Sequence, residues 1–279
     1  MAETVDFETL YPDIRDTGDT NLRRCQLVMG RMLKVMHHLC EKHDVRYFLI
    51  FGSLLGAIRH KGFIPWDDDL DVGMTRSDYE TFIEKVVPEL PNDIFFQNSV
   101  TDKHYPPSGV VEARLRDKYS KYTDKYKYHD GLLVDIFVYD KAYLPSQPLI
   151  VLQNRILRLF RSDKIRAAIL KKIASMSDKL LYCNSFYYKL YQMSGQLCAF
   201  EEDWFFPLKK ASFEDFEVYI PNNYEAYLTR MYGDYMTLPP KDQRYGHHTE
   251  QPDPFTPCNH PETLVWKRKT AKKQRRYNF

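Results

Sequence analysis

The spacing of apolar residues predicts alternating helices and short strands over the first half of the chain. From residue 20 to 44, apolar side chains recur every three or four positions with basic residues between them, which predicts an amphipathic helix capped by Thr20. Residues 46–51, RYFLIF, form a short aromatic-rich run typical of a buried strand, and residues 54–60 are predicted as a short helix. We expect further strands at 69–73, 109–115 and 132–138, and a helix at 75–87 that Pro88 ends.

The second half of the chain carries a different pattern. Residues 148–196 repeat an amphipathic helical pattern two or three times and are rich in Lys and Arg. SFEDFEVYIP (212–221) then resembles a strand, and residues 224–233 have helical spacing. We therefore predict an α/β (α+β) fold, in which a mixed-sheet core is flanked by helices and carries an inserted amphipathic helical module. The predicted divisions are a core at 20–147, a basic helical module at 148–200, a part returning to the core at 201–250 and a basic tail at 251–279.

The composition is that of an ordinary globular protein, since 43% of the 279 residues are hydrophobic and 28% are charged. The net charge is only +2, but seven of the last thirteen residues are Lys or Arg. The five cysteines are scattered without a C-x-x-C pair, which favours free thiols in a reducing compartment over a disulfide framework or a zinc finger. The acidic N-terminus argues against a signal peptide, and no apolar run reaches the length of a membrane span, so we expect a cytoplasmic protein.

An acidic cluster stands out from this background, because WDDDLD places Asp67, Asp68, Asp69 and Asp71 within five positions. On a strand that begins at Asp69, Asp69 and Asp71 share a face and lie about 6.6 Å apart along the chain. Oxygen-only ligands select a hard cation, which predicts Mg²⁺, with Mn²⁺ as the alternative ion. Without a cation, carboxylates this close repel one another or take up protons. The alternative is a polar loop whose aspartates cap turns.

The residues before and after this cluster favour the metal. Gly52 allows close approach to the backbone, and Ser53 with the first amides of the following helix can hold a phosphate. Asp135 lies alone in the apolar run LLVDIFV, where a carboxylate is unfavourable unless it is paired or bound to a metal. A hydrogen bond from nearby backbone is the alternative explanation for Asp135. A phosphate cradle with a three-carboxylate clamp suits Mg²⁺-dependent chemistry on a nucleotide.

The order of these motifs resembles the nucleotidyltransferase superfamily. The stretch GSLLGAIRHKGFIPWDDDLDVGMTRSDYE is similar to the signature of the LicD family, and the resemblance continues at ARLRD (113–117), VDIFVYD (134–140) and YGDYMTLPP (232–240). It spans most of residues 25–248. The resemblance implies a nucleotidyltransferase-like fold. It also implies transfer of phosphocholine, or of ribitol phosphate in fukutin-related relatives, from a CDP-activated donor to a glycan.

The resemblance also implies roles for the acids. Asp69 and Asp71 would hold the Mg²⁺ with Asp135 as the third carboxylate, and Asp135 would also take the proton from the acceptor hydroxyl. Asp67 and Asp68 would orient the loop and water around the ion, with Asp68 the weaker candidate because strand alternation turns it away from Asp69.

Basic and aromatic residues near the acids are the candidates for substrate contacts, and each has a structural alternative. Basic groups after the short helix can neutralise the donor diphosphate or end the helix favourably, and the latter is favoured for Lys61. The indole of Trp66 can stack on cytosine, cover the choline ammonium or pack in the core. One of Arg114 and Arg116, which share a face, can clamp the diphosphate, with surface charge as the alternative. The complete set of candidate substrate-binding residues is Gly52, Ser53, Arg59, His60, Lys61, Trp66, Arg114, Arg116, His247 and His248.

The expected partners are CDP-choline or another CDP-alcohol and a lipid-linked glycan acceptor of the teichoic acid or lipopolysaccharide type. Basic residues at 150–172 and in the tail suit contact with an anionic membrane surface. Nucleic acid is not expected, because no recognition motif accompanies the basic residues. These features predict a bacterial cytoplasmic enzyme, with peripheral contact at the inner face of the membrane left open. The competing interpretations are a true nucleotidyltransferase and a non-catalytic partner of a glycan assembly complex.

Overall fold

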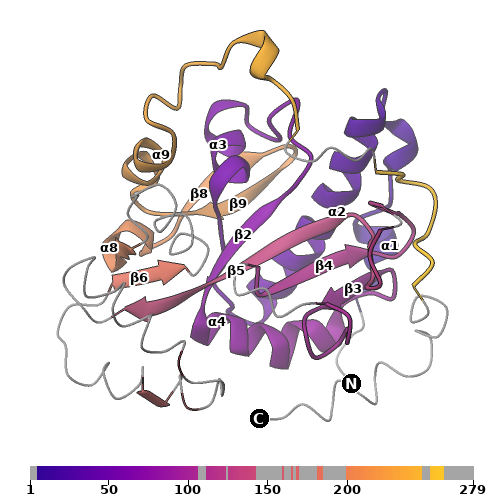
Figure 1. The fold of residues 1–279 in the computed structure, drawn as a ribbon, viewed down its shortest axis with the longest axis horizontal. Coiled ribbons are helices and arrows are strands. Elements are labelled where there is room, and N and C mark those ends of the chain that lie inside the picture. The colour runs from indigo at the N-terminus through magenta and orange to yellow at the C-terminus, as the bar shows by residue number, and fades with distance from the viewer. Residues whose placement is uncertain are drawn as a thin grey trace.

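The computed structural model describes residues 5–105, 111–123, 125–142, 181–184, 199–246 and 252–260, together with positions 159, 165, 168 and 169. Its described part is built around one mixed sheet with helices packed against it (Figure 1). The predicted fold class is therefore confirmed. The predicted domain divisions remain predictions, because most of the module at 148–200, His247 and His248, and the basic end of the tail at 267–279 lie outside the described residues.

The main sheet has β5 at its centre. Strand β2 runs parallel to β5, and the other pairings in this sheet are antiparallel. The first half of β5 pairs with β4 and its second half with β6, so the ten residues of β5 join two parts of the sheet. The strands are β1 Phe48–Leu49, β2 Asp71–Thr75, β3 Ile94–Gln97, β4 Ala113–Asp117, β5 Leu133–Ala142, β6 Leu181–Asn184 and β7 Ala199–Glu201.

The longest helix, α2 (Asn21–Lys42), follows the predicted pattern. Thr20 accepts a hydrogen bond from the amide of Arg23, as expected of an N-cap, and the apolar face of the helix is fully buried. It packs against β4 and β5. The other helical segments are α1 Phe7–Leu10, η1 Arg15–Thr17, α3 Phe51–Arg59, α4 Arg76–Thr81, the π-turn η2 Phe82–Val86, η3 Val87–Glu89, α8 Glu202–Phe205, α9 Tyr224–Tyr232 and η4 Lys241–Gln243.

Several element boundaries differ from the predictions. Helix α3 begins at Phe51, so Gly52 and Ser53 lie in its first turn instead of before it. Strand β2 begins at Asp71 and not at residue 69, and β4 lies at Ala113–Asp117 instead of 109–115. Short apolar runs do not fix their own ends, because the last paired residue is set by the neighbouring strand.

Two predicted segments were wrong in kind. The strand expected at 212–221 is a hairpin of β8 (Lys209–Phe213) and β9 (Phe216–Ile220), in which Glu214 adopts a left-handed backbone conformation in the turn. Residues 181–184, predicted as helix, form β6 beside β5. A four-residue apolar stretch fits either period, so only its pairing with β5 decides.

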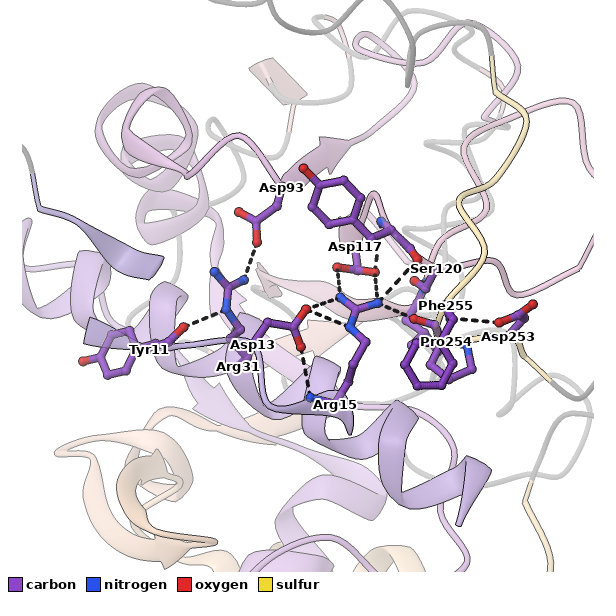
Figure 2. A network of polar contacts seen from close by, with 12 residues as sticks. Tyr11, Asp13, Arg15, Arg31, Asp93, Asp117, Ser120, Asp253, Pro254 and Phe255 are labelled. Atoms are coloured by element: carbon purple, nitrogen blue, oxygen red, sulfur yellow. Dashed lines mark hydrogen bonds and ion pairs between the residues drawn. The ribbon is translucent and has the colours of Figure 1, made fainter. Parts of the chain in front are cut away.

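The C-terminal segment 252–260, predicted as part of a basic tail, lies against the core. Asp253 forms an isolated bridge with Lys121, Asn21 donates to the carbonyl of Pro252 at 2.8 Å, and Arg15 donates to the carbonyl of Pro254. Figure 2 shows the contact between Arg15 and Pro254. These contacts place Arg15 against the end of β4 at Asp117, and Asp253 against Lys121 just after that strand.

Two further expectations can be compared with the described residues. Cys25 and Cys40 are free thiols, in agreement with the prediction for these two residues. Among the described helices, none combines the length and the apolar character needed to cross a bilayer.

Candidate active site

A row of polar side chains crosses the sheet at the start of β2 and β5. Asp71 lies directly opposite Asp135, Asp135 opposite Arg114, and Arg114 opposite Gln97 on β3. Residues directly opposite in paired strands share a face, so this row lies on one face of the sheet. The following positions, Val72, Ile136 and Ala113, form the next row on the other face and are fully buried. The single charged residue of LLVDIFV is thus explained by its position in this row.

Contacts with the start of α3 hold Asp71 in position. The Ser53 hydroxyl accepts a 2.8 Å hydrogen bond from the amide of Asp71, and the amide of Ile50 donates to the carbonyl of Asp71 at 3.3 Å. The rings of Phe51 and Phe137 meet edge to face at 5.1 Å, which holds α3 against β5. Ser53 therefore positions a carboxylate, and its predicted contact with a phosphate remains a proposal.

The loop before β2 brings three more carboxylates to the same place. Ligand oxygens of Asp67, Asp68 and Asp69 all lie within 4.8 Å of one another. Because β2 begins only at Asp71, these residues are not held to strand alternation, and Asp68 does not turn away as predicted. The side-chain amide of Gln26 on α2 donates a hydrogen bond to the backbone carbonyl of Asp67 at 3.0 Å and so fixes the loop to the core.

Burial and mutual repulsion change the acid–base properties of this cluster. The pKa of Asp67 is raised to about 8, by burial first and then by Asp69 and Asp68. Burial, followed by the charges of Asp69, Asp135 and Asp67, raises the pKa of Asp71 well above its usual value. Carboxylates that retain protons near neutral pH are those for which a divalent cation can substitute.

The donor set suits Mg²⁺. The described carboxylates that gather here are Asp67, Asp68, Asp69, Asp71 and Asp135, and such all-oxygen sites favour hard cations. The ligand set inferred from the sequence, Asp69, Asp71 and Asp135, remains a proposal. Asp67 is an additional candidate because its carboxylate lies in the same cluster, where the charges of Asp69 and Asp68 help to raise its pKa.

Arg114 and Arg116 have different environments although they share a face. Arg114 pairs with Asp135 through two contacts, Nε to Oδ1 at 2.5 Å and a terminal nitrogen to Oδ2 at 3.4 Å. Arg116 is only 1% exposed and donates to Gln97 Oε1 at 2.8 Å and to the carbonyl of Gly131 at 2.6 Å. Surface charge is thus the wrong alternative for Arg116, which is a buried support, and Arg114 is the better candidate for a substrate contact.

The basic residues Arg59, His60 and Lys61 stand at the end of α3, and Arg59 lies beside the segment that follows α9. Arg59 donates to the carbonyl of Tyr235 at 2.7 Å, and the ring of His60 packs edge-on against Trp66 at 6.0 Å. Burial and the charge of Arg244 lower the pKa of Arg59. The side chain of Lys61 is exposed. Among the described residues, no ion pair of Lys61 supports the structural alternative, in which it stabilises the end of the helix. Their predicted contacts with the diphosphate remain proposals.

Trp66 packs partly against the core, which agrees with the structural alternative considered for it. Its ring also carries a cation, since the Arg244 guanidinium lies 5.4 Å from the ring centroid. His247 and His248 lie outside the described residues. Gly246, just before them, is close to the site: a Cβ added there would lie 2.6 Å from Asp68 Oδ2.

One residue of the site was not identified from the sequence. Burial and then the charges of Asp71, Asp67 and Asp69 raise the pKa of Tyr232, which places its phenol near the acidic cluster even though 43% of the residue is exposed. Tyr232 ends α9, and the contact of α9 with α3 brings it here. Its signal was present in YGDYMTLPP, but an exposed-looking tyrosine at a helix end has no spacing that marks a role.

Gly52 has a specific steric function in this arrangement. A Cβ at this position would lie 2.7 Å from Asp67 Oδ2, closer than ordinary contact. We therefore expect Gly52→Ala to move the Asp67 carboxylate and to weaken Mg²⁺ binding about tenfold, within the range for residues that orient metal ligands. Isothermal titration with Mg²⁺ measures this effect. Gly30→Ala is the matched control, because a Cβ there meets only Phe63 at 3.7 Å, and equal metal affinities for both variants would contradict the expectation.

A surface cavity of about 860 Å³ lies elsewhere, at the end of β1 remote from the acids. Its walls are lined by Cys40, Glu41, Asp44, Val45, Arg46, Glu202, Asp203, Phe206, Pro207, Leu208 and Tyr219. None of the polar residues described above contributes to this cavity. The chemistry is therefore assigned to the face of the sheet that carries Asp71 and Asp135.

Known proteins are similar to this chain in sequence. The family described as LicD/FKTN/FKRP, nucleotidyltransferase domain, matches residues 44–155, which include the acidic cluster, Arg114 and Asp135. Lipopolysaccharide cholinephosphotransferase LicD of Haemophilus influenzae is 31% identical over 269 residues, covering 82% of this chain and 97% of the relative. The chain belongs to the LicD family. The family inferred from the sequence is thereby confirmed, and with it the class of enzyme, a transferase.

Two other relatives match shorter parts of this LicD family member. A protein of Rickettsia prowazekii is 30% identical over 146 residues, which is 44% of this chain and 52% of the relative. Human ribitol 5-phosphate transferase FKRP is 41% identical over 54 residues, or 19% of this chain and 11% of that protein. The likeness to the human protein therefore concerns one short region.

Proposed function

We propose that this protein is a Mg²⁺-dependent phosphotransferase that moves phosphocholine from CDP-choline to a sugar hydroxyl of a cell-surface glycan precursor and releases CMP. The observation that carries the proposal is the Asp71–Asp135 pair beside Arg114, in a chain that is similar over 82% of its length to a lipopolysaccharide cholinephosphotransferase. A precursor of the lipopolysaccharide type is favoured by that relative's name, and a teichoic acid type is the alternative.

The proposed reaction is a displacement at the phosphorus that carries choline. The acceptor hydroxyl oxygen forms a bond to this phosphorus, and the bond from the phosphorus to the bridging oxygen breaks. CMP leaves with the bridging oxygen as part of its phosphate. The hydroxyl proton passes to the Asp135 carboxylate, whose orientation is held by the two contacts with Arg114.

The remaining residues position the reactants and balance charge. Asp69, Asp71 and Asp135 would hold Mg²⁺, which would supply positive charge to balance the diphosphate. The Ser53 hydroxyl keeps Asp71 in place by accepting a hydrogen bond from the backbone amide of Asp71. The side chain of Gln26 keeps the Asp67 loop in place. The side chain of Arg114, which pairs with Asp135, is 20% exposed, and we propose that it also contacts a phosphate oxygen of the donor.

Product analysis with doubly labelled CDP-choline and Mg²⁺ tests this proposal, with a crude glycolipid fraction as acceptor. Phosphocholine transfer puts the choline label into the glycolipid and the cytidine label into free CMP. True nucleotidyl transfer puts the cytidine label into the glycolipid and releases phosphocholine. No turnover of any CDP-alcohol, combined with normal Mg²⁺ binding, would instead indicate a non-catalytic partner of glycan assembly.

A ribitol phosphate donor is the second candidate, because one region resembles ribitol 5-phosphate transferase FKRP. The same assay with CDP-ribitol and CDP-glycerol in place of CDP-choline separates these donors. The proposed acceptor is lipid-linked, and the enzyme would meet it at an anionic membrane surface on the cytoplasmic side. Co-sedimentation with vesicles of anionic and of neutral lipid tests that contact.

A further inference from the structure

Three tyrosines gather beside Arg114, and we call Tyr105, Tyr126 and Tyr128 the tyrosine cluster. The rings of Tyr126 and Tyr128 stack with centroids 4.6 Å apart and planes at 12°. Tyr105 meets Tyr128 edge to face at 5.6 Å. Tyr105 comes from the segment after β3, and the other two come from the connection between β4 and β5. The meeting of Tyr105 with Tyr128 is therefore tertiary, whereas Tyr126 and Tyr128 are neighbours two positions apart in the chain.

Arg114 joins the tyrosine cluster to the proposed catalytic carboxylate. Its guanidinium lies 5.5 Å from the ring centroid of Tyr105 while it pairs with Asp135. Burial and then Tyr126 raise the pKa of Tyr128 to about 12, while the charge of Arg114 acts to lower it, so Tyr128 lies in the same surroundings as Arg114. One guanidinium group thus separates the aromatic rings from Asp135, and the face of Tyr105 already accepts a cation in this fold.

The tyrosine cluster is graded from buried to open. Tyr105 is 4% exposed, Tyr128 is half-buried, and Tyr126 is 52% exposed. A cluster that served only the core would be enclosed by other apolar side chains. Here the outermost ring stands at the surface with its stacked partner behind it, so a ligand group can approach the rings from solvent.

We propose that the tyrosine cluster binds the quaternary ammonium of the choline group while the adjoining phosphate faces Arg114 and the acidic cluster. This inference rests on the proposed function and names the part of the site that would select choline. A trimethylammonium group cannot donate N–H hydrogen bonds, so it is recognised through the negative faces of aromatic rings. Its two-carbon link to the phosphate keeps both groups near each other, as the tyrosine cluster and Arg114 are.

The charge of Arg114 does not oppose this placement. Burial works against its positive charge, but Asp135 and the neighbouring Tyr105 raise its pKa, and the two contacts with Asp135 balance the charge locally. A ribitol or glycerol phosphate donor carries no cation and would gain nothing from the aromatic faces. The tyrosine cluster therefore favours a cationic alcohol among the CDP-alcohols.

Steady-state kinetics of Tyr126→Leu and Tyr126→Phe with CDP-choline and CDP-ethanolamine test this inference. Loss of the exposed ring should raise KM for CDP-choline about 5- to 30-fold with little change in kcat, as expected for a cation–π contact remote from the reacting phosphorus. The CDP-ethanolamine KM should change less, because a primary ammonium retains hydrogen-bonding partners. Tyr126→Phe keeps the aromatic face and should retain more of the preference for CDP-choline than Tyr126→Leu does.

Tyr119→Leu is the matched control, since Tyr119 is equally exposed at 53% and lies outside the tyrosine cluster. An unchanged preference for choline over ethanolamine in Tyr126→Leu, with CMP release intact, would overturn the inference and leave the proposed function standing. Failure of the unsubstituted protein to release CMP from any donor is a different result, visible before any variant is made. It would overturn the proposed function and this inference together.

Discussion

Asp71→Asn should abolish phosphotransfer and at the same time make the metal-free protein more stable. Asp71 is buried at the start of β2, and its carboxylate repels Asp69, Asp135 and Asp67. The asparagine keeps the shape of the side chain but loses its charge, which removes a proposed metal ligand. We therefore expect the activity to fall by about 10²–10⁴-fold or more. Relief from repulsion should stabilise the chelator-treated protein by about 1 kcal/mol or more, or about 2–4 °C in Tm at this size.

The pH dependence of this stabilisation has a defined sign. The folded-state pKa values of Asp71 and Asp67 lie above the unfolded value, so between about pH 4 and 8 the folded protein binds more protons than the unfolded chain. Stability of the metal-free protein therefore falls as the pH rises through this range. The advantage of Asp71→Asn should be larger at pH 8 than at pH 5, measured by thermal unfolding in chelator.

Mg²⁺ should reverse the order of the two proteins. Binding only to the folded state, it stabilises by about 2.7 kcal/mol at one hundred times its dissociation constant. The unsubstituted protein should gain this stability and Asp71→Asn should gain little. Asp19→Asn, which removes an exposed acid, is the control and should follow the unsubstituted protein. A chelator-treated Asp71→Asn that melts below the unsubstituted protein would show that repulsion in this cluster is not the dominant effect.

Much of this candidate site could be predicted from the sequence because its residues lie in short motifs. Asp67–Asp71 and Asp135 are conspicuous acids beside apolar runs, and strand periodicity predicted that Asp135 interrupts a buried strand. The direct opposition of Asp71 and Asp135 was not predictable, since it depends on the parallel pairing of β2 with β5. Periodicity assigns residues to faces of a strand, but it does not choose the neighbouring strand or the register.

The incorrect predictions share one physical cause. Strands β3 and β6 are four residues each, too short for a period to be recognised, and they exist because β4 and β5 present open edges to them. Glu214 in its left-handed conformation turns what resembles one strand into a hairpin. Arg116 was predicted as a candidate diphosphate contact with surface charge as the alternative, because no local pattern reveals the partners Gln97 and Gly131 that allow its burial.

The tyrosine cluster shows the same limit at the functional site. With 21 tyrosines in the chain, aromatic content alone cannot mark the walls of a binding site. Tyr105 and Tyr128 are separated by the whole of β4, and only the fold of the segments around that strand brings their rings to 5.6 Å. Ligand cages built from several loops are therefore visible only in three dimensions.

Arg15→Met should lower the free energy of unfolding by about 3–5 kcal/mol, the range for removing one partner of a buried ion pair. Arg15 is 6% exposed and contacts three segments of the chain (Figure 2). It donates to Asp117 Oδ1 at 3.0 Å at the end of β4, to Asp13 Oδ2 at 2.7 Å, and to the carbonyl of Pro254. Burial raises the pKa of Asp117 even with Arg15 present, so its carboxylate would be left without compensation.

Thermal and urea unfolding of matched variants isolate this contribution. Arg23→Met removes an arginine that pairs with Glu214 at 2.6 Å but is one-third exposed, and it should lose no more than about 1 kcal/mol. Arg15→Met combined with Asp117→Asn should recover part of the loss, because the uncompensated charge is then absent. Equal effects of Arg15→Met and Arg23→Met would contradict the expectation. Because β4 also carries Arg114, loosening its end at Asp117 should raise KM for the donor even at temperatures where Arg15→Met stays folded.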